Sequence, residues 1–334
     1  TYETGWSFWN GSLLGGSSNF MSGYFHRLKP IDFQLKSTYG KIKGANVEDW
    51  PISYKDMEPY YDMVEKVIGV SGEYTKYAHA EPRTNKKYAY PKLEEHPIVE
   101  LIDKACKELN YTSYKVPRAI LSQNKENRKA CYYSNYCGSY ACSSGAKGSS
   151  RAALLQDAIK TNNITIISNA FVSKLITNKD KKIEKAEYIT KNNNKKTVEA
   201  KLFIVAAQAV ETSRLLLNSK NSDFPKGLAN SSGQVGKNML FTGGGIGSGV
   251  FDSSIISDKK LFQTGLFVNR GLKDWYFTKE FKGGTVDFLF EHANPIRKAN
   301  SQKWDNNGDL VWGEELYKKL EKQHVEPLLS KYKA

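Results

Sequence analysis

Two segments in the first third of the chain place hydrophobic residues at helical spacing. In the first, Ser53 and Asp56 have the spacing of a capping box, which predicts a helix that begins at about Tyr54. Gly69 suits the position after the last turn and is predicted to end this helix. The apolar residues that recur at helical spacing are Met57, Tyr60, Tyr61, Val64 and Ile68.

The second helical segment reads HPIVELIDKACKELN and begins at His96. Pro97 suits the first turn, because proline lacks the amide that a helix interior needs. Cys106 lies beside the apolar stripe and is interpreted as a small buried hydrophobic residue. The stripe itself consists of Ile98, Leu101, Ile102, Ala105 and Leu109.

The middle of the chain mixes helical and strand-like patterns. A helix capped by Ser149 or Ser150 precedes four apolar or alternating runs at residues 164–168, 170–177, 182–190 and 198–207. Lysine and asparagine turns separate the last three runs, and ETSRLLLNS then forms a short helix. Strand-like TVDFLFEH and the helical tail EELYKKLEKQHVEPLL follow later. In this order, a first strand is followed by short antiparallel strands and then by another buried strand. The pattern predicts an α/β sheet with an inserted antiparallel meander.

Length and charge narrow the class of protein. A chain of 334 residues favours two domains, and no run approaches the roughly 18 apolar residues of a membrane span. The net charge of +14 suggests nucleic acid as a partner, but much of the lysine lies in runs such as NKDKKIEK, and no nucleic-acid-binding motif accompanies it. We therefore expect no nucleic-acid partner. The opening TYETGWSFWN shows no targeting signal, so the sequence alone does not indicate a location.

Glycine-rich stretches are the first candidates for ligand binding. In LLGGSSNF, residues 13–20, adjacent glycines let a ligand approach the backbone and the polar residues supply donors, although the octapeptide alone favours a plain surface turn. GGGIGSG, residues 243–249, lacks the last glycine of a dinucleotide fingerprint, and we reject it as a phosphate loop. In residues 202–219 a predicted strand runs into a helix, an arrangement that favours anions but is common in ordinary α/β packing.

Three of the four cysteines lie close together, with the spacing Cys131-x5-Cys137-x4-Cys142. Zinc usually needs four ligands in closer pairs, and disulfides would leave one thiol over. Three thiolates suit an iron–sulfur cluster, although common ferredoxin spacings differ. The spacing leaves a cluster, disulfides and simple packing open.

Several segments together resemble the glucose–methanol–choline (GMC) oxidoreductases, which bind FAD. The matching stretches are GGSSNFMSGYFHRLKPIDF, DWPISYKDMEPYYDMVEKVIGVSG, the three cysteines with SSGAKGS, NAFVSKLI, FIVAAQAVETSRLLLNS and LANSSGQVGKNM. They occur in the family's order and cover about residues 5–240. The similarity is strongest to the branch of gluconate 2-dehydrogenase flavoproteins and the membrane-bound fructose and glucose dehydrogenases.

The resemblance implies roles for particular residues. It implies that five residues lie along the FAD pyrophosphate and flavin, namely Gly15, Gly16, Ser17, Ser18 and Asn19. Val172 would meet the adenine through its backbone, and Ala206 and Ala207 would flank the ribose and diphosphate. The cysteines resemble those that hold a three-iron cluster, which implies Cys131, Cys137 and Cys142 as metal ligands. Gln208 departs from the family's usual turn at its position.

Two parts of the family pattern are not in this sequence. The fingerprint G-x-G-x-x-G belongs before LLGGSSN, and the catalytic histidine with its partner lies in a C-terminal segment. None of the histidines fits that pattern: His26, His79, His96, His292 and His324. We therefore expect an internal fragment with a Rossmann-like FAD-binding fold that lacks its N-terminal βαβ unit and its catalytic segment. Residues 1–45 and 95–240 would form the FAD-binding part, and 46–94 and 241–334 the cap or substrate part.

The implied protein is an FAD-dependent dehydrogenase of a sugar or sugar acid, with gluconate as the leading substrate. Electrons would pass through the iron–sulfur cluster to a cytochrome. A small subunit and a cytochrome c subunit are the implied partners, at the periplasmic side of the cytoplasmic membrane, with peripheral attachment through those partners. The alternatives are a GMC-type oxidase of alcohols or sugars and a catalytically inactive fragment that acts as a subunit-contact module.

Overall fold

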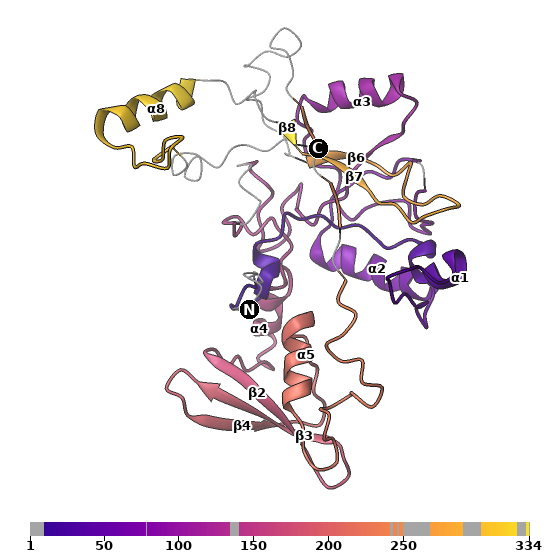
Figure 1. Ribbon diagram of the computed structural model, residues 1–334, viewed down its shortest axis with the longest axis vertical. Helices are drawn as coiled ribbons and strands as arrows, with labels where there is room; N and C mark the ends of the chain where they lie inside the picture. Colours follow the sequence, from indigo (N-terminus) through magenta and orange to yellow (C-terminus); the bar gives the residue numbers. More distant parts are fainter. Residues whose placement is uncertain are drawn as a thin grey trace. The chain divides into compact units, whose positions relative to one another are not determined.

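The structure is a computed structural model, and it describes residues 10–77, 79–133, 140–240, 243–245, 247–249, 268–289, 302–325 and 332–333. The chain divides into two compact units (Figure 1). The first consists of Thr1–Asn163 and Gly245–Ala334, and the second of Ile164–Gly244. Within the described part of the chain, no helix combines the length and the apolar character that a membrane span requires.

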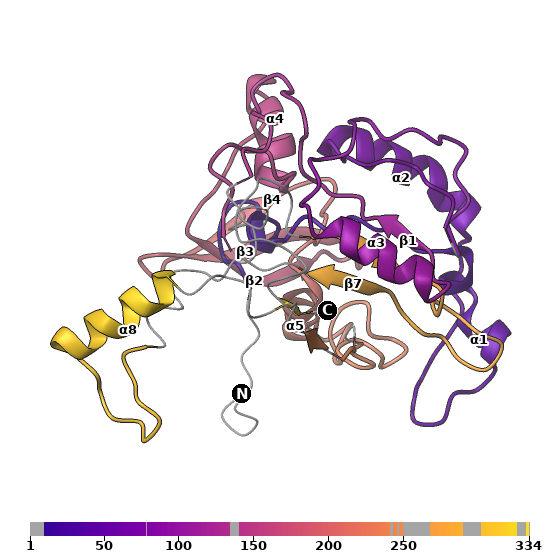
Figure 2. The same ribbon diagram turned by 90° about the horizontal axis from the view of Figure 1, so that it is seen from above.

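The first unit combines helices with an antiparallel sheet. Its α-helices are α1 (Leu35–Tyr39), α2 (Tyr54–Ile68), α3 (Val99–Glu108), α4 (Gln156–Lys160) and α8 (Gly313–Val325). Shorter turns are η1 (Gly16–Asn19), η2 (Pro30–Phe33) and the π-helical η3 (Arg151–Leu155), which continues into α4. The sheet has the order β1 (Ser113–Lys115), β6 (Val268–Leu272), β7 (Val286–Leu289), β8 (Tyr332–Lys333) and β5 (Ser248–Gly249). Helix α3 lies against β1 and β6 (Figure 2).

Helix α2 begins and ends where the sequence predicts. The Ser53 hydroxyl accepts a hydrogen bond from the amide of Asp56, whose carboxylate accepts from the Ser53 amide, and Gly69 takes a left-handed conformation after the last turn. The apolar residues at helical spacing are divided between surface and interior, since Tyr60 and Val64 are exposed and Met57, Tyr61 and Ile68 are partly buried. Apart from Tyr54 at its start, the fully buried residue of the helix is Glu65. Glu65 faces inward because two buried arginines bind its carboxylate.

Helix α3 shows a similar shift of its buried face. Ile98 of the predicted stripe is buried, but the buried residues within the helix are Val99 and Cys106, and Leu109 at the end of the stripe is 65% exposed. The interpretation of Cys106 as a buried hydrophobic residue is confirmed, because it is 4% exposed and unbridged. The next helical stretch is capped as expected, since the Ser149 hydroxyl accepts from the amide of Ala152 at 3.1 Å.

The second unit is an antiparallel meander with one helix. Strands β2 (Ala170–Thr177), β3 (Ile183–Thr190) and β4 (Lys195–Glu199) pair in sequence order, and α5 (Ala209–Asn218) packs against β2 (Figure 1). Its core is formed by Leu175, Ala186, Leu215 and Leu228. The predicted meander and short helix are confirmed.

The flanking strands of the predicted α/β sheet are not formed. Residues 164–168 and 202–207 carry no strand, and Leu202 and Ile204 are 76% and 84% exposed. A strand needs a neighbour that satisfies its amides and carbonyls, and no segment of the described residues pairs with these two runs. The observed fold is therefore mixed α/β with antiparallel sheets, in place of a sheet that continues through these runs.

Candidate cofactor-binding site

The glycine turn, residues 13–20, bends sharply just before η1. Gly15 and Gly16 have φ angles of 89° and 55°, in the left-handed region that favours glycine. The Gly16 amide donates to the carbonyl of Leu13 at 2.8 Å and closes the turn. The motif LLGGSSNF is thus a tight turn, as the octapeptide by itself indicates.

Asn19 fixes the shape of the glycine turn from inside. Its side chain is buried, and its Nδ2 donates to the carbonyls of Leu14 at 3.0 Å and Gly16 at 2.9 Å. Its Oδ1 accepts from Arg151 Nε at 3.0 Å. All of these contacts are internal, so Asn19 supports the turn and leaves ligand contact there to other groups.

A second segment, far along the chain, packs on the glycine turn. The Ser150 amide donates to Ser18 Oγ at 3.1 Å, and Ser18 Oγ donates to the carbonyl of Gly15 at 2.5 Å. A Cβ at Gly15 would lie 2.8 Å from Cβ of Arg151, so a side chain there would push this segment away. Gly15 is therefore needed for packing as well as for its backbone conformation.

Gly16 presents the open side of the turn. Among the described residues, a Cβ added there would meet only the carbonyl oxygen of Gly11, at 3.8 Å. Ser17 Oγ accepts from the Gly11 amide at 2.9 Å and keeps its own hydroxyl proton for another acceptor. A backbone that is open on one side and rigidly supported on the other fits FAD, whose phosphates and ring edge need close backbone approach.

The cysteine loop, residues 131–146, packs against the main hydrophobic cluster of the first unit. That cluster consists of Leu93, Ile120, Leu121 and Ala146, and both Cys131 and Cys142 lie against it. The sulfur of Cys131 accepts a hydrogen bond from the Tyr133 amide at 3.3 Å. The thiol of Cys142 is free. The fold thus places two predicted ligands beside one apolar cluster.

Cys142 lies in a set of hydrogen-bond donors. Burial would raise the pKa of its thiol, but hydrogen bonds from the Ser144 hydroxyl and from the amides of Lys147, Ser144 and Ala146 outweigh burial and lower it. Donors of this kind favour the thiolate, which is the form that binds iron. The chemistry of this donor set fits a metal–sulfur site at Cys142.

Cys137 lies outside the described residues, together with the rest of residues 134–139. In the described part of the chain, no three side chains of the metal-binding types gather at one point. The predicted triad therefore remains a prediction, of which the structure describes two members.

The linking segment, residues 145–151, joins the cysteine loop to the glycine turn. Lys147 is buried, and its Nζ donates to the carbonyls of Met21 at 2.8 Å and Tyr140 at 2.5 Å. Met21 follows the glycine turn directly, and Tyr140 lies two residues before Cys142. Together with Ser150 and Arg151, this lysine fixes the two predicted cofactor loops next to each other.

The other predicted FAD contacts belong to the second unit. Val172 lies on β2, and its carbonyl accepts a hydrogen bond from Arg214 at 3.5 Å. Ala206 and Ala207 are exposed and precede Gln208, which has a φ of 73°. The Gln208 Oε1 accepts from the amides of Val210 at 2.8 Å and Glu211 at 3.4 Å. The side chain of Gln208 thus caps α5 and takes up amides that an anion would use.

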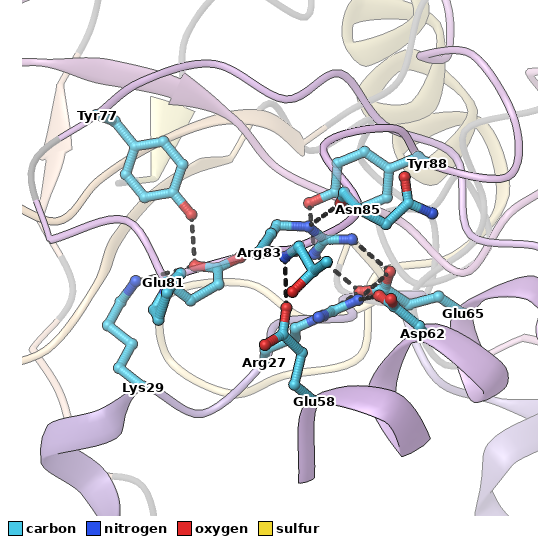
Figure 3. A network of polar contacts seen from close by, with 12 residues as sticks. Arg27, Lys29, Glu58, Asp62, Glu65, Tyr77, Glu81, Arg83, Asn85 and Tyr88 are labelled. Carbon is cyan, nitrogen blue, oxygen red and sulfur yellow. Dashed lines mark hydrogen bonds and ion pairs between the residues drawn. The ribbon is translucent and has the colours of Figure 1, made fainter. Parts of the chain in front are cut away.

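A buried ionic network is the main polar feature that the sequence patterns did not predict (Figure 3). Glu65 accepts from both Arg27 and Arg83, with four contacts of 2.6 to 3.1 Å. Beside them, Glu81 accepts from Lys29 at 3.0 Å and from Tyr77 at 2.7 Å. The segment HRLK, residues 26–29, could have indicated this network. Its two long basic side chains, Arg27 and Lys29, need charged partners if they are buried.

No described histidine forms a catalytic pair. His26 has both ring nitrogens buried without a hydrogen-bond partner, and burial, followed by the charge of Lys273, lowers its pKa to about 3. His96 is buried, and its Nδ1 accepts from the Ile98 amide at 3.3 Å. His79 contacts the carbonyl of Asp274.

Comparison with known proteins places the chain in a family. It is 27% identical to paromamine 6'-oxidase of Streptomyces fradiae over 88% of this chain and 53% of that protein. The large subunit of fructose dehydrogenase from Gluconobacter japonicus is 32% identical over 68% of this chain and 40% of its own length. The gluconate 2-dehydrogenase flavoprotein of Pantoea cypripedii is 25% identical over 70% of this chain and 42% of its own length.

The chain thus spans about half the length, or less, of these relatives. A family model for GMC oxidoreductases matches residues 3–241, which include the glycine turn, the cysteine loop and the whole meander. The chain belongs to the GMC oxidoreductase family.

Proposed function

We propose that the protein to which this chain belongs oxidises a CH–OH group of a sugar or sugar acid, with gluconate as the leading substrate. The observation that carries the proposal is the linking segment, which holds the glycine turn through Ser150 and Arg151 and the cysteine loop through Lys147. FAD at the turn would supply a hydride acceptor, and an iron–sulfur cluster at the cysteines would supply a one-electron carrier.

The residues of the chain have separate tasks in this proposal. Gly16 leaves the backbone open to the cofactor, while Asn19 and Ser18 keep the turn in one conformation. The donors around Cys142 favour its thiolate and so prepare it as an iron ligand. The base that removes the hydroxyl proton is expected in a catalytic segment outside this chain.

Partners and location are part of the same proposal. The fructose dehydrogenase relative is named as a large subunit, and the gluconate 2-dehydrogenase relative as a flavoprotein. We infer that this protein works with a small subunit and a cytochrome c subunit at the periplasmic side of the cytoplasmic membrane. The Rossmann-like FAD-binding fold of the complete protein belongs to the same proposal.

The second candidate is an oxidase without a cluster. It is favoured by two relatives named as oxidases, which match 88% of this chain, a larger share than the dehydrogenases match. In that case Cys131 and Cys142 are packing residues of the hydrophobic cluster beside them.

The test is an assay of flavin, iron and acid-labile sulfide on the full-length protein, purified without oxygen. We expect FAD together with near-equal iron and sulfide in the natural protein. Cys142→Ser should lose the sulfide and the reduction of an external acceptor, while substrate still bleaches the flavin. Cys106→Ala, which removes the buried cysteine of α3, is the matched control and should keep both.

The outcomes separate the two candidates. Flavin without sulfide in the natural protein would overturn the cluster and favour the oxidase. Absence of flavin as well would overturn both enzymes and favour a subunit-contact role.

A further inference from the structure

Arg151 brings a positive charge directly to the glycine turn. Its Nε donates to Asn19 Oδ1 at 3.0 Å, and a Cβ added at Gly15 would lie 2.8 Å from its own Cβ. Asn19 in turn donates to the carbonyl of Gly16 at 2.9 Å. The guanidinium is therefore held at the turn, with one amide group between it and the backbone of Gly16.

The outer part of this guanidinium is not used within the protein. Arg151 is exposed, and within the described part of the chain its Nη1 and Nη2 form no hydrogen bond or ion pair. Asp157, the next acidic residue along the chain, pairs instead with Lys160 at 3.1 Å. Because arginine carries its N–H groups in a planar fork, the outer donors of Arg151 are available to a ligand that lies beside the turn.

The glycine turn itself carries no charge. Residues 10–25 contain no Asp, Glu, Lys or Arg, and the proton that Ser17 keeps for another acceptor belongs to a neutral hydroxyl. Of the two cations in the linking segment, Lys147 is buried and donates to backbone carbonyls, whereas Arg151 is exposed. A hydrogen bond from a charged donor to an anion is roughly twice as strong as one between neutral groups. An anionic ligand at the turn would therefore gain most from Arg151.

We propose that Arg151 binds a phosphate of the FAD pyrophosphate at the glycine turn. The inference rests on the proposed function and adds a cofactor-binding residue to it. FAD, when bound, supplies the negatively charged pyrophosphate, and the planar fork of arginine matches two phosphate oxygens at once. The contact with Asn19 already orders the side chain, so less conformational entropy is lost when the ligand binds.

Three variants of the full-length protein separate the charge of Arg151 from its support of the turn. Arg151→Gln removes the charge but keeps an amide donor for Asn19. Arg151→Lys keeps the charge and loses the planar fork. Lys160→Gln is the matched control, because it removes one positive charge from α4, which directly follows η3, and Lys160 pairs there with Asp157 at the surface.

The measurement is the dissociation constant of FAD, obtained by removing the flavin and titrating it back at several salt concentrations. Riboflavin, which has no phosphate, is titrated in the same way. We expect Arg151→Gln to weaken FAD binding about tenfold, which corresponds to about 1.4 kcal/mol, and to leave riboflavin binding unchanged. Arg151→Lys should lose less, and Lys160→Gln should match the natural protein. Added salt should weaken FAD binding more in the natural protein than in Arg151→Gln, because salt screens the charge that the variant lacks.

Each result decides the role of Arg151. Equal FAD affinity in Arg151→Gln and the natural protein would overturn the proposal, as would an equally large loss in Lys160→Gln. An equal loss of FAD and riboflavin binding in Arg151→Gln would assign Arg151 to the support of Asn19 alone and overturn the phosphate contact.

The natural protein provides a test that does not depend on the folding of Arg151→Gln. FAD binding that weakens with salt, together with an intermediate affinity in Arg151→Lys, supports the proposal, and FAD binding that is independent of salt overturns it. A natural full-length protein that purifies without flavin and binds no added FAD would instead show that the proposed function itself fails.

Discussion

Buried cations are balanced in one part of the first unit and unbalanced in another. Around Glu65, two guanidinium groups face two carboxylates, since Arg27 also binds Asp62. Near Cys142, the acceptors of Arg128 among the described residues are carbonyl oxygens. Arg27 and Arg83 thus have charged partners, whereas the described acceptors of Arg128 are neutral.

The difference separates two ways in which this fold buries a cation. Carboxylates at Glu65 complete the network within the protein, and their cost of desolvation is offset there. Carbonyls at Arg128 satisfy its donors without cancelling its charge.

The largest expected effect comes from removing the shared carboxylate. Glu65→Gln keeps the shape of the side chain but leaves Arg27 with the partly exposed Asp62 and Arg83 with Glu81, whose carboxylate is 3.8 Å away. We expect the free energy of unfolding to fall by about 3–5 kcal/mol, the usual cost of leaving a buried charge unpaired. Urea denaturation of the full-length protein, followed by intrinsic fluorescence, measures this loss.

A comparison within the same cluster sharpens the result. Asp62 is 32% exposed in its side chain and binds Arg27 alone, so Asp62→Asn should cost clearly less than Glu65→Gln. Equal losses for the two variants would mean that charge balance, rather than the shared geometry of Glu65, stabilises the network.

The next effect concerns His26, which lies near the charged network without a hydrogen bond of its own. Burial, then the charges of Lys273, Arg118 and Lys29, lower its pKa from 6.5 to about 3, and Glu81 opposes them. The unfolded chain binds a proton on His26 below pH 6.5 while the folded chain does not. His26 should thus cost stability progressively as the pH falls from about 6.5 to about 3.

His26→Leu tests this account. The variant removes two unpartnered nitrogens without changing the size of the side chain much, so it should cost little at pH 7. Between pH 6.5 and 3 its stability should fall less than that of the natural protein, by roughly 4–5 kcal/mol in total at about 1.4 kcal/mol per pKa unit. Parallel pH profiles of the two proteins would contradict a neutral buried His26.

Local signals in the sequence predicted local structure well. The capping box of α2, the lysine and asparagine turns of the meander and the helix after them depend on residues within a few positions of each other. The inward position of Glu65 could not be predicted in this way, because its partners Arg27 and Arg83 lie 38 and 18 residues away. A prediction from the apolar pattern alone places a charged residue such as Glu65 at the solvent-exposed surface.

The candidate site shows the same limit. Adjacent glycines and clustered cysteines mark Gly15, Gly16 and Cys142 in the sequence, but the contact between the two motifs depends on Ser150, 132 residues from Ser18. Resemblance to a family supplied their roles, and the structure supplied their proximity. The run at 202–205 is apolar enough for a buried strand, yet it forms none because a strand requires a partner.

The smallest expected effect concerns an ion pair at the surface, and it tests whether burial is what distinguishes the two regions. Lys36 Nζ donates to Glu48 at 2.6 Å, a geometry as good as any in the Glu65 cluster, but the side chains are 52% and 67% exposed. Water solvates both charges whether or not they meet, so Glu48→Gln should change the free energy of unfolding by about 0.5 kcal/mol or less, and added salt should remove the difference. A loss near that of Glu65→Gln would show that pairing itself, and not desolvation, sets the energies.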